Sequence, residues 1–280
     1  MQYADDQALR EKMYEAYVTR ASEVGPDKGE FDNSQVMLDI LKSRQALAKL
    51  LDFNHYADSS LATKMADSPE EVLNFLTDLA KQGKSLAEKE MQDLKTFAET
   101  EYGVTALQPW DLMYYSEKLR KKLYDISQED LRPYFPLDTV LTGLFKLLNR
   151  LYDVTIVEKQ NTEVWHKDVK FYEVKDACGK SRGYFYLDVF VRNHKRGGAW
   201  MDDCRVRRKL GNTIELPVAF VDCNFAKPLE GKPALLTHDD VVTLFHEFGH
   251  CFHHLLTKID YPDVAGINGV AWDAVELPSQ

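Results

Sequence analysis

The segment His246-Glu247-Phe248-Gly249-His250 carries the residues of this chain that are best suited to chemistry. Two histidines four positions apart on an α-helix are separated by about 40° around the axis and about 6 Å along it, so both rings can reach one metal ion. A glutamate beside the first histidine can then take a proton from a water molecule on that metal. The pattern therefore predicts a zinc site that activates water.

The residues around this segment predict a helix that positions it. Thr237 is expected to cap the helix, with Asp240 three residues later completing a capping box. Apolar side chains recur at helical spacing between residues 241 and 255 and form one broad face, while His246 and His250 lie on the opposite side of the helical wheel. We expect this helix to pack on a core and to turn its histidines toward a cleft. The alternative is a surface helix whose histidines face solvent.

A catalytic zinc site normally uses three protein ligands and keeps one position for water. The nearest further candidates are His253 and His254. His253 lies close to the face of the two motif histidines but almost two turns from His246, so a tetrahedral site that used all three would be strained. His253 is therefore expected to support the site from outside the ligand shell or to belong to the core.

Glu276 is the better candidate for the third ligand. The loop 260–271, which contains Gly, Asn and Pro, can turn the chain back toward the helix. The result is a two-histidine, one-glutamate arrangement. Asp273 lies three residues before Glu276, so it would share a helical face with it and could orient a ligand histidine, although an aspartate there is also suited to capping a helix.

The segments 246–250 and Trp272-Asp-Ala-Val-Glu-Leu-Pro-Ser-Gln280 together resemble the thimet oligopeptidase family of zinc peptidases. The similarity is to its bacterial oligopeptidase A branch in particular, and it runs over practically the whole chain. Other stretches that carry the resemblance are Leu61-Ala-Thr-Lys-Met-Ala66, Gln108-Pro-Trp-Asp111, Tyr114-Tyr-Ser-Glu-Lys118, Leu131-Arg-Pro-Tyr-Phe135 and Lys195-Arg-Gly-Gly-Ala-Trp-Met-Asp-Asp-Cys204.

The resemblance implies both a site and an activity. It implies that His246, His250 and Glu276 bind one Zn²⁺ per chain and that Glu247 is the catalytic base. It also implies an endopeptidase that hydrolyses short peptides, with its active site in a deep channel between helical domains that excludes folded proteins. The implied fold is largely helical, with a zincin-type HExxH helix.

Members of that family continue well beyond the segment that matches Gln280, and they also begin before the residue that matches Met1. The resemblance places the tyrosine and histidine side chains that stabilise the tetrahedral intermediate in the later part. We therefore expect residues 1–280 to be an internal piece of a longer enzyme. Because preorganised oxyanion donors matter greatly for rate, we expect this piece alone to be at most a feeble peptidase with some exposed apolar surface.

Composition excludes several classes of protein. The chain has 280 residues, of which 44% are hydrophobic, so it can bury a large core. Its net charge of −10 argues against a nucleic-acid binder, which needs a basic face for phosphates. No stretch approaches twenty apolar residues, so no membrane span is expected.

The four cysteines, Cys178, Cys204, Cys223 and Cys251, form no CxxC pair and no dense framework. Isolated cysteines of this kind are typical of reduced thiols in a cytoplasmic protein. Cys251 points about 100° away from His250 on the helix, so it is expected to be a structural thiol rather than a ligand. We expect a cytoplasmic monomer whose partners are short peptides.

The pattern of the chain changes near residue 152. Residues 1–152 are expected to form a helical region that contributes to the channel wall, and residues 153–280 a catalytic region with a small sheet and the zinc-binding helix, incomplete at its C-terminal end. The fold class is thus mainly α with a small β-sheet, α+β. Helices are expected at 6–23, from 33 or 34 to 52, and at 69–102, 110–124 and 137–152.

Segments rich in β-forming residues occur at 154–157, 169–174, 183–191 and 216–221. They predict a mostly antiparallel sheet directly before the zinc helix. A sheet edge beside the metal would let an extended peptide bind as an added strand, but the sequence does not identify that strand. The basic segment Arg192–Gly198 is interpreted as a solvated hairpin turn, or else as a loop that attracts a substrate carboxylate.

Two classes of function remain from the sequence. One is the zinc endopeptidase, and the other is a binding module that holds zinc or peptide without turnover. Glu247 discriminates between them, because a binding module does not need a carboxylate beside the first metal ligand.

Overall fold

The computed structural model describes residues 1–280 and divides them into two compact units, Met1–Ser127 and Gln128–Gln280. This boundary differs from the one expected after residue 152 by residues 128–152, most of which form the helix α7 (Leu137–Tyr152). The apolar face of α7, including Leu141, Leu144 and Leu148, is buried in the same core as the sheet residues of the second unit. Because a helix belongs to the unit that buries its apolar face, α7 belongs to the second unit.

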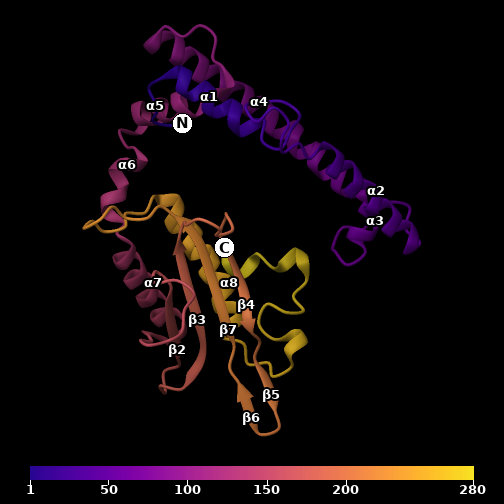
Figure 1. Cartoon of the computed structure of the whole chain (residues 1–280), viewed down its shortest axis with the longest axis vertical. Helices are drawn as coiled ribbons and strands as arrows, with labels where there is room; N and C mark the ends of the chain where they lie inside the picture. Colours follow the sequence, from indigo (N-terminus) through magenta and orange to yellow (C-terminus); the bar gives the residue numbers. More distant parts are fainter. The chain divides into compact units, whose positions relative to one another are not determined.

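The first unit is entirely helical (Figure 1). Its elements are α1 (Gln7–Val18), α2 (Ser34–Leu50), α3 (Tyr56–Leu61), α4 (Pro69–Tyr102), the 3₁₀ turn η1 (Pro109–Asp111) and α5 (Leu112–Tyr124). The expected ends of α4 are confirmed. The Ser68 hydroxyl accepts a hydrogen bond from the Glu71 N–H at 3.1 Å, and Gly103 ends the helix in a left-handed conformation with φ +69°. α1 is shorter than expected and ends at Val18.

The second unit is a mixed sheet with helices. Its helical elements are α6 (Gln128–Leu131), η2 (Arg132–Tyr134), α7, α8 (His238–Leu255), η3 (Pro262–Val264), η4 (Trp272–Ala274) and η5 (Leu277–Ser279). Its strands are β1 (Thr155–Glu158), β2 (Lys170–Lys175), β3 (Ser181–Phe190), β4 (Trp200–Arg205), β5 (Arg208–Leu210), β6 (Thr213–Glu215) and β7 (Val218–Phe225). The chain is thus mainly helical with a small sheet, as expected. None of its helices combines the length and the apolar character that a membrane span requires.

The main sheet has five strands in the order β1-β2-β3-β7-β4. Only the β3–β7 pair is parallel, which confirms a mostly antiparallel sheet directly before α8. The four expected strands are present, but β4 and the separate β5–β6 hairpin were not predicted. β4 has the sequence Trp-Met-Asp-Asp-Cys-Arg, in which neighbouring aspartates disguise the strand because aspartate is depleted in strands.

The interpretation of Arg192–Gly198 as a hairpin turn is wrong. The segment joins β3 to β4, but β7 lies between these two strands in the sheet. Strand β4 pairs antiparallel with β7, with Trp200 opposite Asp222. The connection therefore crosses the end of β7 rather than closing a turn between neighbouring strands.

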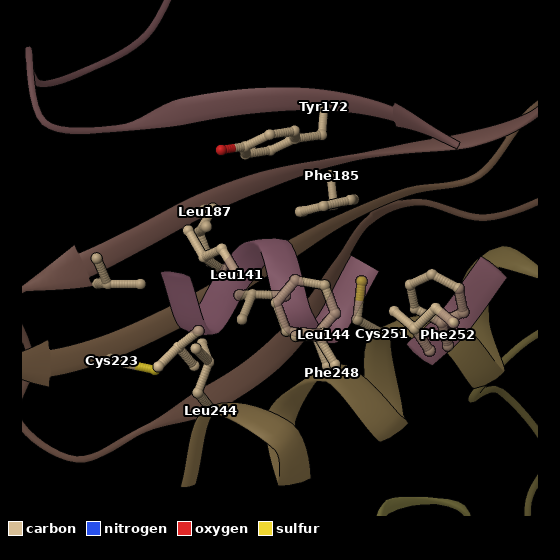
Figure 2. Close-up of a cluster of buried hydrophobic side chains, with 14 of the residues drawn as sticks. Leu141, Leu144, Tyr172, Phe185, Leu187, Cys223, Leu244, Phe248, Cys251 and Phe252 are labelled. Atoms are coloured by element: carbon tan, nitrogen blue, oxygen red, sulfur yellow. The ribbon is translucent and has the colours of Figure 1, made fainter. Parts of the chain in front are cut away.

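Helices α7 and α8 pack on one face of the sheet (Figure 2). Phe248 of α8 lies at the centre of this core, with its ring 5.3 Å from Phe185 of β3 and 6.2 Å from Phe145 of α7. Cys223 and Cys251 are fully buried, and burial raises the pKa of both thiols, that of Cys223 to about 12. All four cysteines are free thiols, and Cys251 belongs to the core as expected.

Candidate metal centre

Helix α8 begins with the expected capping box. The Thr237 N–H donates to Asp240 Oδ2 at 2.9 Å, and the Asp240 N–H donates to Thr237 Oγ1 at 3.1 Å. Two of the N–H groups that a helix start leaves without partners are thereby satisfied. With its start fixed and its apolar side buried against the sheet, the helix holds His246 and His250 in a defined direction away from the core.

The side chains of His246, His250 and Glu276 converge at one side of α8. Glu276 Oε2 lies 3.1 Å from His246 Nε2 and 3.0 Å from His250 Nε2. One ligand atom from each of the three residues lies within 4.8 Å of the other two. Zinc bonds of about 2.0–2.2 Å place the atoms of a tetrahedral site about 3.3 Å apart. The donor set and its spacing therefore fit one zinc ion.

The loop between α8 and Glu276 is packed rather than open. His254 is fully buried, and its Nε2 lies 3.0 Å from the Arg205 carbonyl oxygen at the end of β4. Asn268 Nδ2 donates to Asp203 Oδ2 at 3.1 Å. A Cβ on Gly266 would lie 2.5 Å from His254 Nδ1, so only glycine permits this approach. These contacts fix the return of the chain toward His246 and His250.

Gly249 and Ser279 support the site, and sequence reasoning missed both. A Cβ on Gly249 would lie 2.4 Å from Ser279 Cα and 2.7 Å from the Pro278 carbonyl oxygen, so η5 rests directly on the backbone of α8. The Ser279 hydroxyl donates to the Glu276 carbonyl at 2.7 Å and lies 3.3 Å from Glu276 Oε2. A glycine inside an otherwise strong helix was the available signal, because such a glycine usually has a packing reason.

Glu247 lies on the buried side of the site, with 7% of its surface exposed. Burial raises the pKa of its carboxyl group above the ordinary range. The neighbouring imidazoles of His246 and His250 act in the opposite direction, as does the backbone of Met201 in β4. The carboxyl group of Glu247 is therefore buried beside the two histidines, in a helix that packs against β4.

His253 and Asp273 lie outside the converging group. His253 is half-buried, and burial, with the charges of His250 and His254, lowers the pKa of its imidazole. Its Nδ1 is buried without a hydrogen-bond partner. Asp273 is exposed in the 3₁₀ turn η4. Roles for these two residues in orienting the ligands stay predictions.

A cavity of about 900 Å³ lies beside the site and is lined by residues of α7, α8 and 278–280. His246 and His253 line it together with apolar side chains such as Leu147 and Phe245. His250 is only 13% exposed at its side chain and His246 34%. The histidines therefore do not belong to a plain solvent-facing surface, and His246 lies in the wall of a cleft.

A helix that presents two histidines, with a glutamate between them and a second glutamate returned by a loop, is the arrangement of a zinc hydrolase. The family model described as peptidase family M3 matches residues 1–280. The chain belongs to peptidase family M3, and the resemblance found in its sequence is confirmed.

Similar proteins are found among bacterial peptidases. The chain is 58% identical to oligopeptidase A of Haemophilus influenzae over 281 residues and 56% identical to oligopeptidase A of Escherichia coli strain K12. It is 38% identical to dipeptidyl carboxypeptidase of the same E. coli strain over 277 residues, which cover 98% of this chain and 40% of that protein. Both oligopeptidase A matches cover 100% of this chain but only 41% of the relative. The chain thus spans about two fifths of the length of these curated relatives.

Proposed function

We propose that this chain is the metal-binding part of a zinc-dependent endopeptidase that hydrolyses short peptides. The observation that carries the proposal is the convergence of His246, His250 and Glu276 on one point, with the buried carboxyl group of Glu247 next to it. Membership of peptidase family M3 and the similarity to two oligopeptidases support the same reading. Because the chain spans two fifths of those relatives, the activity is proposed for the whole protein.

In this proposal His246, His250 and Glu276 hold the metal, and Ser279 restrains the Glu276 carboxylate. A bound zinc ion supplies Lewis acidity, which lowers the pKa of water and polarises the scissile carbonyl. Glu247 accepts the proton of the attacking water at its carboxylate. It then delivers that proton to the nitrogen of the departing amine.

Strand β4 is the proposed binding edge for the peptide. β4 pairs only with β7 and so leaves its other edge unpaired. The opposite edge of the sheet, β1, packs near α7, whereas α8 packs near β3, β7 and β4. β4 is thus an edge strand that packs against α8, the helix that carries Glu247. A peptide added to β4 would therefore run past the catalytic carboxylate, with its backbone held by ladder hydrogen bonds.

The remaining parts of the proposal follow the sequence expectations. The helical region contributes to a channel wall, the protein acts as a cytoplasmic monomer, and its partners are peptides rather than nucleic acids or membranes. The net charge of −10 supports the exclusion of nucleic acid as a partner. The four free thiols support a reducing compartment such as the cytoplasm.

The test is a comparison of the Glu247→Gln variant with the unchanged protein. The variant should keep one zinc per chain, because Glu247 is not a ligand, and should lose about three or more orders of magnitude in turnover of a quenched fluorescent oligopeptide. Zinc content is measured on the same samples. Near-normal turnover in a variant free of the unchanged enzyme would remove Glu247 from the mechanism. Zinc binding and peptide binding without any turnover in the full-length protein would favour the binding module.

A further inference from the structure

The connection between β3 and β4 is built over a buried carboxylate, Asp188, whose side chain is 1% exposed. Arg192 donates to both of its oxygens, at 2.7 and 2.6 Å, Lys195 Nζ donates at 2.9 Å and Trp165 Nε1 at 2.9 Å. Burial alone would raise the pKa of Asp188, but these donors outweigh it and hold the pKa at about 2. Two basic residues of the predicted turn are thus directed into the protein.

Lys195 differs from Arg192 in what else it contacts. Its side chain is 4% exposed, and its Nζ lies 2.8 Å from the Asp188 carbonyl oxygen, 3.2 Å from that of Phe190 and 2.6 Å from that of Cys223. The ammonium group therefore joins the end of β3 to the backbone of β7. Arg192 already forms a two-point ion pair with the carboxylate. Neutralisation of Asp188 alone would not require Lys195 to reach three carbonyl groups.

The path from Lys195 to the proposed catalytic base is short and held at several points. Asn224 Nδ2 donates to the carbonyl oxygens of Arg196 and Gly198, at 2.8 and 2.7 Å. Strand β4 begins two residues later and packs against α8, the helix that carries Glu247. The position of β4 relative to α8 therefore depends on how the β3–β4 connection is anchored.

We infer that Lys195 is a positioning residue. It holds the edge strand β4 in the position at which a peptide bound along that edge passes Glu247. This inference rests on the proposed function, in which β4 receives the substrate. Arg192 neutralises the same carboxylate but contacts no backbone carbonyl of β7. Lys195 and Arg192 therefore form a matched pair, since they share an ion-pair partner and a loop and differ in their contact with the sheet.

The experiment compares Lys195→Met with Arg192→Met in the zinc-loaded, full-length protein. Each variant is assayed with an oligopeptide and with the same peptide N-methylated at one backbone amide outside the scissile bond. Removing one ladder hydrogen bond should cost the unchanged enzyme about tenfold in kcat/KM. Lys195→Met should raise KM for the parent peptide about tenfold, because the edge of β4 is no longer aligned with Glu247. For the same reason it should reduce the N-methylation penalty in kcat/KM to about twofold. Arg192→Met should keep the full penalty.

Hydrogen exchange gives a second readout that does not depend on activity. Amides in 196–205 should exchange faster in Lys195→Met than in Arg192→Met, while amides of α7 and β2 stay alike in the two variants. Equal behaviour of the two variants in both measurements overturns the inference and leaves the proposed function standing. Zinc-loaded parent enzyme that cleaves no peptide overturns the proposed function, and the exchange data still decide whether Lys195 positions β4.

If Lys195→Met does not fold, the Asn224→Ala variant replaces it in both measurements. This substitution removes the two bonds to Arg196 and Gly198 without leaving a buried charge unpaired. Faster exchange in 196–205 and a reduced N-methylation penalty are expected. An unchanged N-methylation penalty together with unchanged exchange would show that the anchoring of the β3–β4 connection does not position β4, and would overturn the inference.

Discussion

Replacing Gly249 with alanine should weaken zinc binding although Gly249 is not a ligand. The added Cβ would lie 2.4 Å from Ser279 Cα, whereas ordinary contact begins at 3.4 Å, so the segment must retreat by about 1 Å. The nearest atoms belong to backbone and cannot rotate away. Glu276 begins the same short turn, and metal–ligand distances tolerate only about 0.2 Å. We expect zinc affinity to fall by about 10- to 100-fold.

Gly143→Ala in α7 is the matched control. A Cβ at Gly143 meets nothing within 4 Å, so alanine should simply stabilise the helix by about 1 kcal/mol. Gly249→Ala gains the same helix propensity but also incurs an overpacking cost of about 1–3 kcal/mol. Competition with a chelator gives the zinc dissociation constant, and urea unfolding of the metal-free chain gives the free energy of unfolding.

A double-mutant cycle with Glu276→Gln shows whether the effect passes through that carboxylate. If Gly249 acts by placing Glu276, the double variant should bind zinc no more weakly than Glu276→Gln alone. A zinc dissociation constant for Gly249→Ala within twofold of the parent value would refute the reasoning. Either Glu276 would then not be a ligand or η5 would not rest on α8.

Three further predictions concern single side chains. Glu276→Gln should weaken zinc retention by one to several orders of magnitude, and His253→Gln should weaken it far less. Zinc retention is measured by metal analysis after dialysis. Equal loss of zinc from the two variants would contradict the choice of Glu276 as third ligand. Ser279→Ala should weaken zinc binding by about tenfold, because the Glu276 carboxylate loses a restraint, and an unchanged chelator titration would count against that role. The pKa of Asp188 falls from 3.8 to about 2 on folding, so its ionised form stabilises the fold by about 2 kcal/mol above pH about 4, and this stability is lost as the pH falls toward 2. Urea unfolding at pH 5 and at pH 2.5 should therefore show a larger difference between the parent and Asp188→Asn at pH 5; the same difference at both values would contradict the ion-pair account.

The features that were predictable from the sequence are those governed by local rules. The capping box at Thr237 and Asp240 and the end of α4 at Gly103 depend on hydrogen bonds within a few residues, and all are present. The bounds of α7 were predicted to the residue because its apolar spacing and its flanking residues agree. The assignment of α7 to the second unit was not predicted, because it depends on which surface buries the apolar face of the helix.

Strand β4 shows the opposite case. Its adjacent aspartates conceal it, and its place at the sheet edge follows only from pairing with β7, a contact between distant parts of the chain. The same is true of Lys195, whose sequence context indicates a solvated turn. A lysine in a basic segment that ends in two glycines carries no local sign that its ammonium group will be buried against three carbonyl oxygens.

The sequence by itself determined the chemistry available to this protein, because two histidines at helical spacing can reach one metal ion and the glutamate beside the first can reach a water molecule on it. It also determined the α8 helix, since capping and apolar periodicity are encoded within it. Only the tertiary structure decided that Glu276 returns to His246 and His250, that Gly249 admits η5, and that β4 packs against α8. These relations join residues that are far apart in the chain, and close packing rather than local propensity fixes their distances.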